Sequence, residues 1–342
     1  MPPRQLILRS WQSPGDVVVM TAAVRELHRQ YPGQYQTGVR TSTPAVWEHN
    51  PFITPIADNA EGPMSFDMGY PLIHASNQRP IHFVEGYCDD LAQKLGLASL
   101  RPHEFRGHIY LSDEERGWMN QVEETTGYQG RFWLVNAGRK RDFTCKQWPT
   151  ENFQAVVNHF GGKLMFAQIG AAEHEHPPLE HVIDLRGKTD HRQLIRLVYH
   201  AAGVLTGVSY PMHLAAAVPC PPPNTGAPQT LRPCVVVNGG REPPHWEQYP
   251  AHQFLHVIGS LSCCATGGCW RSRIAPLGDG DGKDRDLCQQ PQAGYPRCMW
   301  MITPADVIRA IEKYHQADSI LGSAPERDSV GNALRGVPCP AN

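Results

Sequence analysis

The stretch RFWLVNAGRKRDFTCKQWPTENFQAVVNHF, residues 131–160, decides the fold class of this chain. Residues 132–135 are continuously apolar and predict a buried strand, and a polar loop follows as far as Pro149. Thr150 is the expected N-cap of a helix that runs to Phe160. The same alternation continues downstream, with strands predicted at 163–169, 182–185, 202–205 and 234–237, and helices at 190–200 and 211–218. Strands that alternate with helices of about ten residues predict parallel βαβ connections and a doubly wound sheet.

A shorter unit of the same kind opens the chain. A strand is predicted at 6–9, a turn at 13–16, and a helix at 17–31 that ends at Pro32-Gly33. Further helices are predicted at 83–95 and 112–126, the second opened by a Ser/Glu capping box. We therefore expect an α/β protein with two Rossmann-like domains, 1–128 and 129–315, facing each other across a deep cleft. The predicted last helix, 304–314, precedes a flexible tail at 316–342.

Size and composition fit this organisation. The chain has 342 residues, of which 41% are hydrophobic and 19% charged, and its mean hydropathy is −0.41. No apolar run approaches the ~18 residues of a membrane span, and the N-terminus lacks a secretory signal, so we expect a cytoplasmic protein. The net charge of −2 and the pI of about 6.8 give no indication of a nucleic-acid-binding surface.

Five short motifs follow one another between roughly residues 5 and 240. They are Ser13-Pro14-Gly15-Asp16, Lys146-Gln147-Trp148-Pro149-Thr150-Glu151-Asn152-Phe153, Gly170-Ala171-Ala172-Glu173, Leu185-Arg186-Gly187-Lys188-Thr189 and His213-Leu214-Ala215-Ala216-Ala217. In this order they resemble glycosyltransferase family 9, the ADP-heptose heptosyltransferases. The resemblance implies a GT-B fold whose last helix returns to the first, acceptor-binding domain, while the second domain binds the nucleotide sugar. It also implies an inverting enzyme that transfers a sugar, with heptose favoured, from an ADP-sugar to an acceptor hydroxyl of a protein, a lipopolysaccharide core or a small molecule.

Two residues carry the predicted chemistry. Asp16 lies at a strand-to-helix turn and is the candidate general base for the acceptor hydroxyl, although an aspartate there could equally be a plain helix cap. Lys146 is the candidate that neutralises the leaving diphosphate, since no catalytic divalent metal is expected. The run Arg139-Lys140-Arg141 in the same loop could share this task or could be a solvated basic loop.

Six further residues are predicted to bind the donor. The resemblance places Glu173 near the ribose and Thr189 at the adenine. The run 173–176, Glu-His-Glu-His, is unusual, so a solvated loop or a metal site remains an alternative for Glu173. A helix N-terminus that could bind a phosphate follows the strand at 202–205. Trp246 could contact the base or the sugar, or it could pack against the nearby cysteines. The residues that complete this set are Ser209, Met212 and His213. The lipopolysaccharide enzymes carry Asp-Thr-Gly before this helix, and this chain does not, so the acid expected to bind the donor sugar is missing.

Cysteines are concentrated in the segment 260–300. Five of them fall within 36 residues and predict a tetrahedral iron or zinc site with a structural role: Cys263, Cys264, Cys269, Cys288 and Cys298. The segment resembles the iron knuckle of the bacterial autotransporter heptosyltransferases, whose acceptors are protein serines or threonines. Unligated buried cysteines are the alternative. The remaining five look incidental, with an exception for Cys145 because it precedes Lys146: Cys88, Cys145, Cys220, Cys234 and Cys339.

Two expectations concern the rest of the chain. The acidic stretch 278–286 lacks the closing glutamate of a calcium loop and is predicted to be solvated and flexible. The chain starts almost directly at its first strand, so we do not expect the large ring assemblies of the autotransporter branch. The competing class of function is a cysteine–metal binding protein in which the transferase motifs are vestigial.

Overall fold

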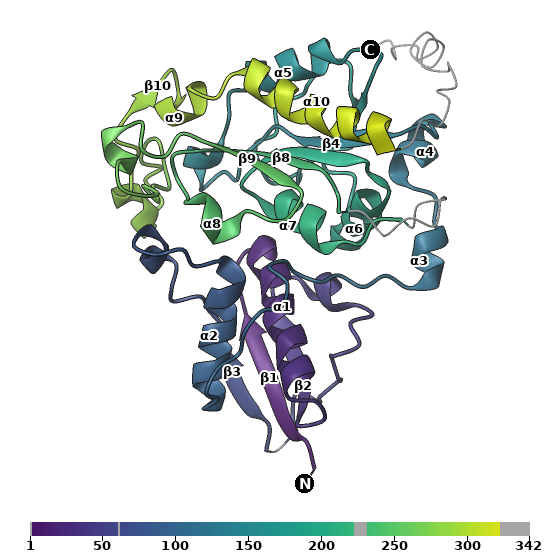
Figure 1. Cartoon of the computed structure of the whole chain (residues 1–342), viewed down its shortest axis with the longest axis vertical. Coiled ribbons are helices and arrows are strands. Elements are labelled where there is room, and N and C mark those ends of the chain that lie inside the picture. The colour runs from purple at the N-terminus through teal and green to yellow at the C-terminus, as the bar shows by residue number, and fades with distance from the viewer. Residues whose placement is uncertain (1, 61, 222–230, 322–342) are drawn as a thin grey trace.

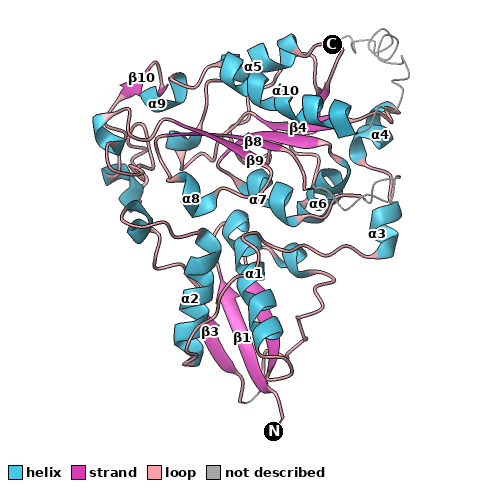
Figure 2. Cartoon of the chain, viewed as in Figure 1, coloured by secondary structure: helices cyan, strands magenta, loops and turns pink. Residues whose placement is uncertain are grey.

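The computed structural model describes residues 2–60, 62–221 and 231–321, the last six without their side chains. A small three-stranded parallel sheet lies at the N-terminal end, with strand order β2-β1-β3 (Figures 1 and 2). Leu8, on the central strand, pairs with Val39 on one side and Phe66 on the other. The elements of this part are β1 (Arg4–Ser10), α1 (Pro14–Gln30), β2 (Tyr35–Thr41), β3 (Met64–Asp67) and α2 (Phe83–Leu95), with 3-10 turns at Pro44–Trp47 and His74–Asn77.

The second sheet has six parallel strands in the order β6-β5-β4-β7-β8-β9. Its strands are β4 (Phe132–Asn136), β5 (Met165–Gln168), β6 (Ile183–Asp184), β7 (Gly203–Gly207), β8 (Cys234–Gly239) and β9 (His252–His256). The strand order reverses between β4 and β7, and ligands of doubly wound proteins bind at this kind of switch point. The prediction of a doubly wound parallel sheet is confirmed.

Helices cover both faces of this sheet. In Figure 1, α5 (Thr150–His159) and α10 (Pro304–Leu321) lie on one face, and α6 (His191–His200) and α7 (Tyr210–Ala217) lie on the other. Asp190 caps α6 in a reciprocal capping box with Gln193. Pro149, not Thr150 as predicted, is the N-cap of α5.

The connection between the sheets differs from the prediction of one helix over 112–126. It contains two short helices, α3 (Asp113–Gly117) and α4 (Gln121–Thr126), each opened by its own capping side chain. Both helices pack on α6, where Gln121 Nε2 donates to the carbonyl oxygen of Gln193 at 2.9 Å. These two helices therefore lie against a helix of the second sheet before the chain enters that sheet at β4.

The last helix does not return to the first domain, and that prediction was wrong. α10 packs on α5 and on the second sheet, where Tyr314 Oη donates to the carbonyl oxygen of Cys234 at 3.2 Å. The helix also continues to Leu321, past the predicted start of the tail at 316. The remainder of the predicted tail, 322–342, lies outside the described residues.

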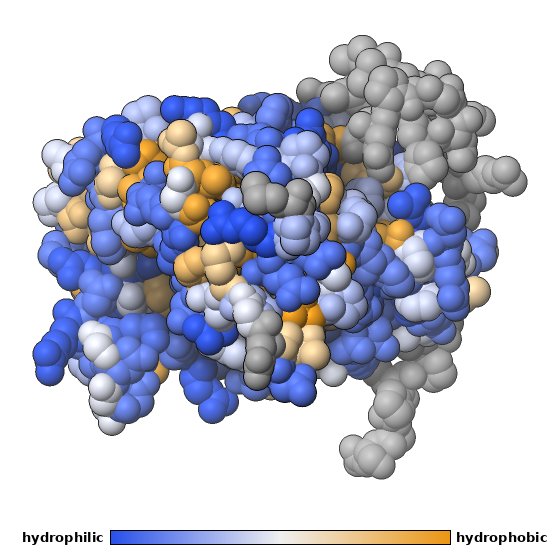
Figure 3. Space-filling model, turned by 90° about the horizontal axis from the view of Figure 1, so that it is seen from below, coloured by the Kyte–Doolittle hydropathy of each residue, from blue (hydrophilic) through white to orange (hydrophobic). Residues whose placement is uncertain are grey.

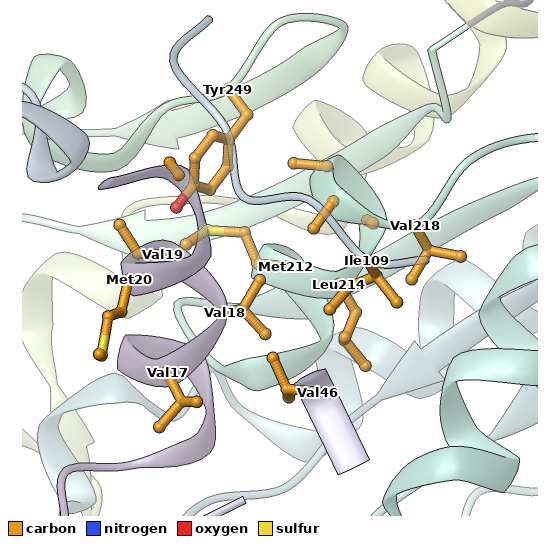
Figure 4. Packing of buried hydrophobic residues seen from close by; sticks show 14 of the residues in the cluster. Val17, Val18, Val19, Met20, Val46, Ile109, Met212, Leu214, Val218 and Tyr249 are labelled. Carbon is orange, nitrogen blue, oxygen red and sulfur yellow. The ribbon is translucent and has the colours of Figure 1, made fainter. Parts of the chain in front are cut away.

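The two domains share a continuous buried core. Helices α1 and α7 pack against each other, with Val18 and Val19 of α1 close to Met212 and Leu214 of α7 (Figure 4). Gly15 permits this approach, because a Cβ atom there would lie 2.5 Å from Cδ2 of His213. These contacts do not confirm an open, deep cleft; the facing ends of the domains are packed together.

The segment between β9 and α10 has little regular structure. It contains η4 (Ser262–Cys264), η5 (Gly282–Arg285), β10 (Pro291–Gln292), β11 (Tyr295–Pro296) and α9 (Arg297–Trp300). The predicted flexible acidic loop is in fact ordered around the enclosed side chain of Arg273, which bonds both carboxylate oxygens of Asp279 at 2.8 Å and also bonds Asp284. Asp281 is the third acid near this guanidinium, with Oδ2 3.8 Å from Arg273 Nη2, and the three aspartates account for the acidity of the loop.

Two observations concern the surface. Within the described ranges, no helix combines the length and apolar character needed to cross a bilayer. The face seen in Figure 3 is mostly hydrophilic, with hydrophobic side chains in several small groups.

Candidate functional site

The predicted catalytic residues meet where the two domains touch. Asp16 lies in the first turn of α1, after β1, and Lys146 lies in a 3-10 turn (Thr144–Lys146) after β4. The loop after β8 adds Arg241 and Glu242, and α8 (Pro244–Glu247) follows it. All these segments start at carboxyl ends of parallel strands, and those of the second sheet flank its switch point.

Asp16 has the capping role that the sequence left open, and its role as general base stays a prediction. One carboxylate oxygen, Oδ2, accepts from the backbone N–H of Ser13 at 3.0 Å, which closes a capping box at the start of α1. The Tyr70 hydroxyl also donates to this carboxylate. Burial raises the pKa of Asp16 from 3.8 to about 6, against the opposing charge of Lys146. A carboxylate with a raised pKa is a better base than an ordinary one at neutral pH.

Lys146 is held by charged groups of the second domain. Its Nζ atom lies 2.8 Å from Oε1 of Glu242, and Arg241 bonds the same carboxylate. Burial and the charge of Arg241 lower the pKa of Lys146, whereas the charges of Glu247 and Asp16 act to raise it. Gly207 allows the close backbone approach, because a Cβ atom there would lie 2.9 Å from the carbonyl oxygen of Lys146.

Sequence reasoning missed two buried carboxylates beside this lysine. Glu242 and Glu247 are each 3% exposed. Among the described residues, Oε2 of Glu242 and Oε1 of Glu247 have no hydrogen-bond partner. Burial raises the pKa of Glu247 to about 7, although Lys146 and Arg241 act in the opposite direction. Two such oxygens can accept hydrogen bonds from a polyhydroxylated ligand.

Two of the predicted donor residues are packing residues. The side chain of Met212 is fully buried in the core between α1 and α7 (Figure 4). Trp246 is 2% exposed and stacks on Phe83 of α2, with ring centroids 4.9 Å apart, and its other neighbours include Trp270 of the cysteine-rich segment. Neither side chain is therefore placed in the donor site. For Trp246, the structure favours the second interpretation offered by the sequence, packing near the cysteine-rich segment.

His213 is also unsuited to binding phosphate through its ring. Its Nδ1 atom is 2.7 Å from the Tyr249 hydroxyl, and burial lowers its pKa to about 3, which leaves the ring neutral. Ser209 lies at the N-cap of α7, where its hydroxyl is 2.8 Å from that of Thr206. Ser209 stays a prediction as a donor contact, because it lies at the switch point and is partly exposed.

Glu173 and Thr189 lie in the loops that follow β5 and β6. Glu173 is exposed and Thr189 is partly exposed, and both remain predictions as nucleotide contacts. Between them, Glu175 is paired with Arg139, whose Nη2 atom is 2.6 Å from the carboxylate. Because Glu175 is already paired, the run 173–176 is a poor metal site. Arg139, one of the three basic residues proposed to bind phosphate, is engaged in the same ion pair.

The cysteine-rich segment forms a cavity of about 20 Å³. Five cysteines line it, and one of them, Cys145, comes from the loop that carries Lys146: Cys145, Cys263, Cys269, Cys288 and Cys298. Cys264, which the sequence placed in the metal set, is 2% exposed and does not line the cavity; its Sγ atom instead lies 3.8 Å from the carbonyl oxygen of Val257. Cys145, which was not part of the predicted metal set, is the fifth cysteine of the cavity lining.

The cavity fits a small ion in size and in charge. Its volume is close to the ~15 Å³ that one water molecule needs. Thiols suit iron or zinc, and a divalent ion with four thiolates carries a net negative charge that three lining guanidinium groups can offset: Arg241, Arg271 and Arg297. Among the described residues, the thiols of this cavity do not form a group at ligand spacing and would have to move closer together to bind an ion. The group that does is Glu48, His49 and Glu115, whose two carboxylates are already paired with Arg192.

Comparisons with known proteins agree with the fold. Residues 74–222 match the family model for glycosyltransferase family 9 (heptosyltransferase). No protein of the curated set matches the chain. A family 9 glycosyl transferase from Veillonella parvula superposes with a TM-score of 0.62 at 14% identity, covering 93% of this chain and 99% of that one.

Two E. coli enzymes are also similar in structure. ADP-heptose lps heptosyltransferase II has a TM-score of 0.60 at 14% identity, covering 92% of this chain and 99% of that one. The dodecameric iron-containing heptosyltransferase TibC, solved with ADP-D-beta-D-heptose, has a TM-score of 0.59 at 17% identity, covering 93% and 78%. The family match and this likeness in fold together support a glycosyltransferase enzyme.

Proposed function

We propose that the chain is an inverting glycosyltransferase that moves a sugar, with heptose favoured, from an ADP-sugar to an acceptor hydroxyl. The observation that carries this proposal is that the buried Asp16 carboxyl lies within the electrostatic influence of Lys146 at the domain contact, beside the switch point of the second sheet. The two similar heptosyltransferases are named for ADP-heptose or were solved with it, which favours the same donor here. A protein serine or threonine, a lipopolysaccharide core or a small molecule could supply the hydroxyl.

Each residue has a defined task in this reaction. The Asp16 carboxylate accepts the proton of the acceptor hydroxyl as its oxygen attacks the anomeric carbon. The bond from that carbon to the diphosphate breaks on the opposite face, and Lys146 and Arg241 stabilise the charge that develops on the departing phosphate. Lys146 must exchange its contact with Glu242 for the phosphate, so donor binding competes with an existing ion pair.

Glu242 and Glu247 supply the acid that the sequence lacks near Ser209. Their unpaired oxygens lie beside Lys146, the residue proposed to bind the phosphate next to the sugar. A carboxylate that accepts hydrogen bonds from sugar hydroxyls is stronger than a neutral acceptor. In this proposal Glu247 holds the sugar, while Glu242 mainly holds Lys146.

The cysteine cavity has a structural part in the proposal. Iron or zinc bound there would fix a segment with few apolar side chains, and the iron-containing neighbour TibC supports iron. We propose a cytoplasmic location, consistent with the absence of a membrane-crossing helix among the described residues.

Lys146→Met tests the proposed phosphate site with ADP as the probe. We expect calorimetry to show ADP binding weakened by at least about tenfold, since a charged hydrogen bond contributes roughly 1.5–3 kcal/mol. Lys163→Met, at an exposed position before β5 and outside this loop, is the matched control and should change ADP affinity little. Equal affinity of Lys146→Met and the unmodified protein for ADP would contradict the proposal.

A further inference from the structure

Asn77 belongs to the first domain and is bonded to the cysteine-rich segment of the second. Its amide oxygen accepts from the backbone N–H of Gly268 at 2.9 Å and from the indole N–H of Trp270 at 3.2 Å. Its amide nitrogen donates to the carbonyl oxygen of Gly268 at 2.9 Å. Gly267 permits this approach, because a Cβ atom there would lie 2.7 Å from Oδ1 of Asn77. One side chain of the first domain thus bonds three polar groups of the second.

The whole turn His74–Asn77 is fitted to this surface. The carbonyl oxygen of Ser76 accepts from Nε2 of His245 in α8 at 2.7 Å. The ring of His74 meets the ring of Trp270 edge to face, with centroids 5.7 Å apart. Asn77 is therefore the centre of a set of contacts between the domains, and its position does not depend on one bond alone.

Trp270 connects Asn77 to the proposed phosphate site. Its backbone N–H donates to the carbonyl oxygen of Arg241 at 3.0 Å, and Nη2 of Arg241 donates back to the carbonyl oxygen of Trp270 at 3.2 Å. The Arg241 guanidinium also lies 5.6 Å from the centroid of the Trp270 ring, which is the range of a cation–π contact. The indole that bonds Asn77 therefore also holds Arg241, one of the two cations proposed to stabilise the departing phosphate.

The backbone of Trp270 is held in an unfavourable conformation. Its φ angle is +57°, in the left-handed region, where a bulky side chain is an outlier. Such a conformation persists when the surrounding contacts enforce it, and it is found preferentially at functional sites. In this protein the contacts that surround Trp270 come from Arg241 on one side and from Asn77 on the other.

We propose that Asn77 is a positioning residue, which holds Trp270 in place and through it orients the Arg241 guanidinium toward the departing phosphate. The inference rests on the proposed function, in which Arg241 and Lys146 bind that phosphate. It adds that the first domain, which carries Asp16, also helps to place a cation of the second domain. The proton acceptor and the phosphate site are then kept in register by a side chain that contacts neither substrate.

Hydrogen exchange at the Trp270 amide tests the first step without any ligand. This amide bonds Arg241 rather than Asn77, so it reports on the transmitted effect. In the full chain, at single-residue resolution, we expect exchange to be about tenfold faster in Asn77→Ala than in the unmodified protein, because a strained backbone loses one of its restraints. Gln78→Ala, at the next and exposed position, should exchange like the unmodified protein.

Pyrophosphate is the probe for the second step. We expect calorimetry to show that Asn77→Ala binds pyrophosphate about fivefold more weakly, a part of what one charged hydrogen bond contributes. Asn77→Asp keeps the oxygen that accepts from Gly268 and Trp270, so its affinity should lie between the two. Trp270→Phe keeps the aromatic face but has no indole N–H, so Asn77→Ala should weaken binding less in that background.

Asn120→Ala controls for a general loss of stability. It removes the bond by which Asn120 caps α4, 3.0 Å from the N–H of Glu123, and should leave pyrophosphate affinity unchanged. The inference is overturned if the Trp270 amide exchanges at the unmodified rate in Asn77→Ala, if pyrophosphate affinity does not fall, or if Asn120→Ala lowers it equally. A failure of the proposed function looks different: the unmodified protein would bind no pyrophosphate, which would overturn the role of Arg241, whereas exchange at Trp270 would still respond to Asn77→Ala.

Discussion

Replacement of Asp16 by asparagine separates its structural role from its chemical one. Asparagine keeps an oxygen that can accept from the Ser13 N–H, so it can preserve this side of the capping box. It removes the charge whose burial raises the pKa of this carboxyl from 3.8 to about 6. In the folded protein the ionised Asp16 is therefore disfavoured by as much as about 3 kcal/mol.

The sign of this effect gives a pH dependence. Below about pH 4, Asp16 is protonated in the folded and unfolded states, and its substitution should leave the free energy of unfolding nearly unchanged. Between about pH 4 and pH 6 the unfolded chain releases the proton first, so the unmodified protein loses stability as the pH rises. Asp16→Asn should then be more stable than the unmodified protein at about pH 8, by up to about 3 kcal/mol.

Two assays complete this test. Chemical denaturation of both proteins across this pH range measures the stability difference, and release of ADP from ADP-heptose measures the chemistry. We expect Asp16→Asn to be about 10²- to 10⁴-fold slower, the usual contribution of a general base. Glu114→Gln, at an exposed position on α3, should alter neither quantity. A stability difference that does not vary with pH would refute the burial argument, and ADP release at the unmodified rate would refute the role as base.

Three further outcomes follow from the site. Glu247→Gln should weaken binding of an ADP-sugar by about 10-fold while leaving ADP affinity unchanged, since it removes a charged acceptor for the sugar. Calorimetry with both ligands measures the two affinities, and a parallel loss of ADP affinity would count against a contact between Glu247 and the sugar. Trp246→Ala should lower the free energy of unfolding by about 3–5 kcal/mol in chemical denaturation, and Trp246→Phe should lower it much less. If Trp246→Ala left stability unchanged but lost donor affinity, Trp246 would belong to the donor site after all. The rate of ADP release should fall as the pH drops below about 6, where Asp16 takes up a proton; a pH-independent rate would argue for another base.

The second sheet could be predicted from the sequence because its strands are buried on both faces. The β8 segment, Cys234–Gly239, is continuously apolar apart from its end, and parallel strands of this kind are easy to recognise. β2 (Tyr35–Thr41) was missed because it mixes threonine, arginine and glycine with few apolar residues. Its strand geometry depends on pairing with β1, which no local pattern shows.

The candidate site was predictable where short motifs fall next to strong elements, as for Asp16 and Lys146. Glu247 was not, because its significance depends on burial beside a lysine about a hundred residues away in sequence. Cys145 was notable in the sequence only for its place beside Lys146, because it lies far from Cys288 and only the packing of the two segments brings both to one cavity.

Thermal-shift screening of the full chain against ADP-, GDP-, UDP- and dTDP-sugars tests the central claim most directly. A ligand at 100 times its Kd stabilises the folded state by about 2.7 kcal/mol, which raises the Tm of a protein of this size by several degrees. We predict that an ADP-sugar raises the Tm and that Lys146→Met abolishes the rise, while the other nucleotide sugars have little effect. No rise with any of the four nucleotide sugars would contradict the account.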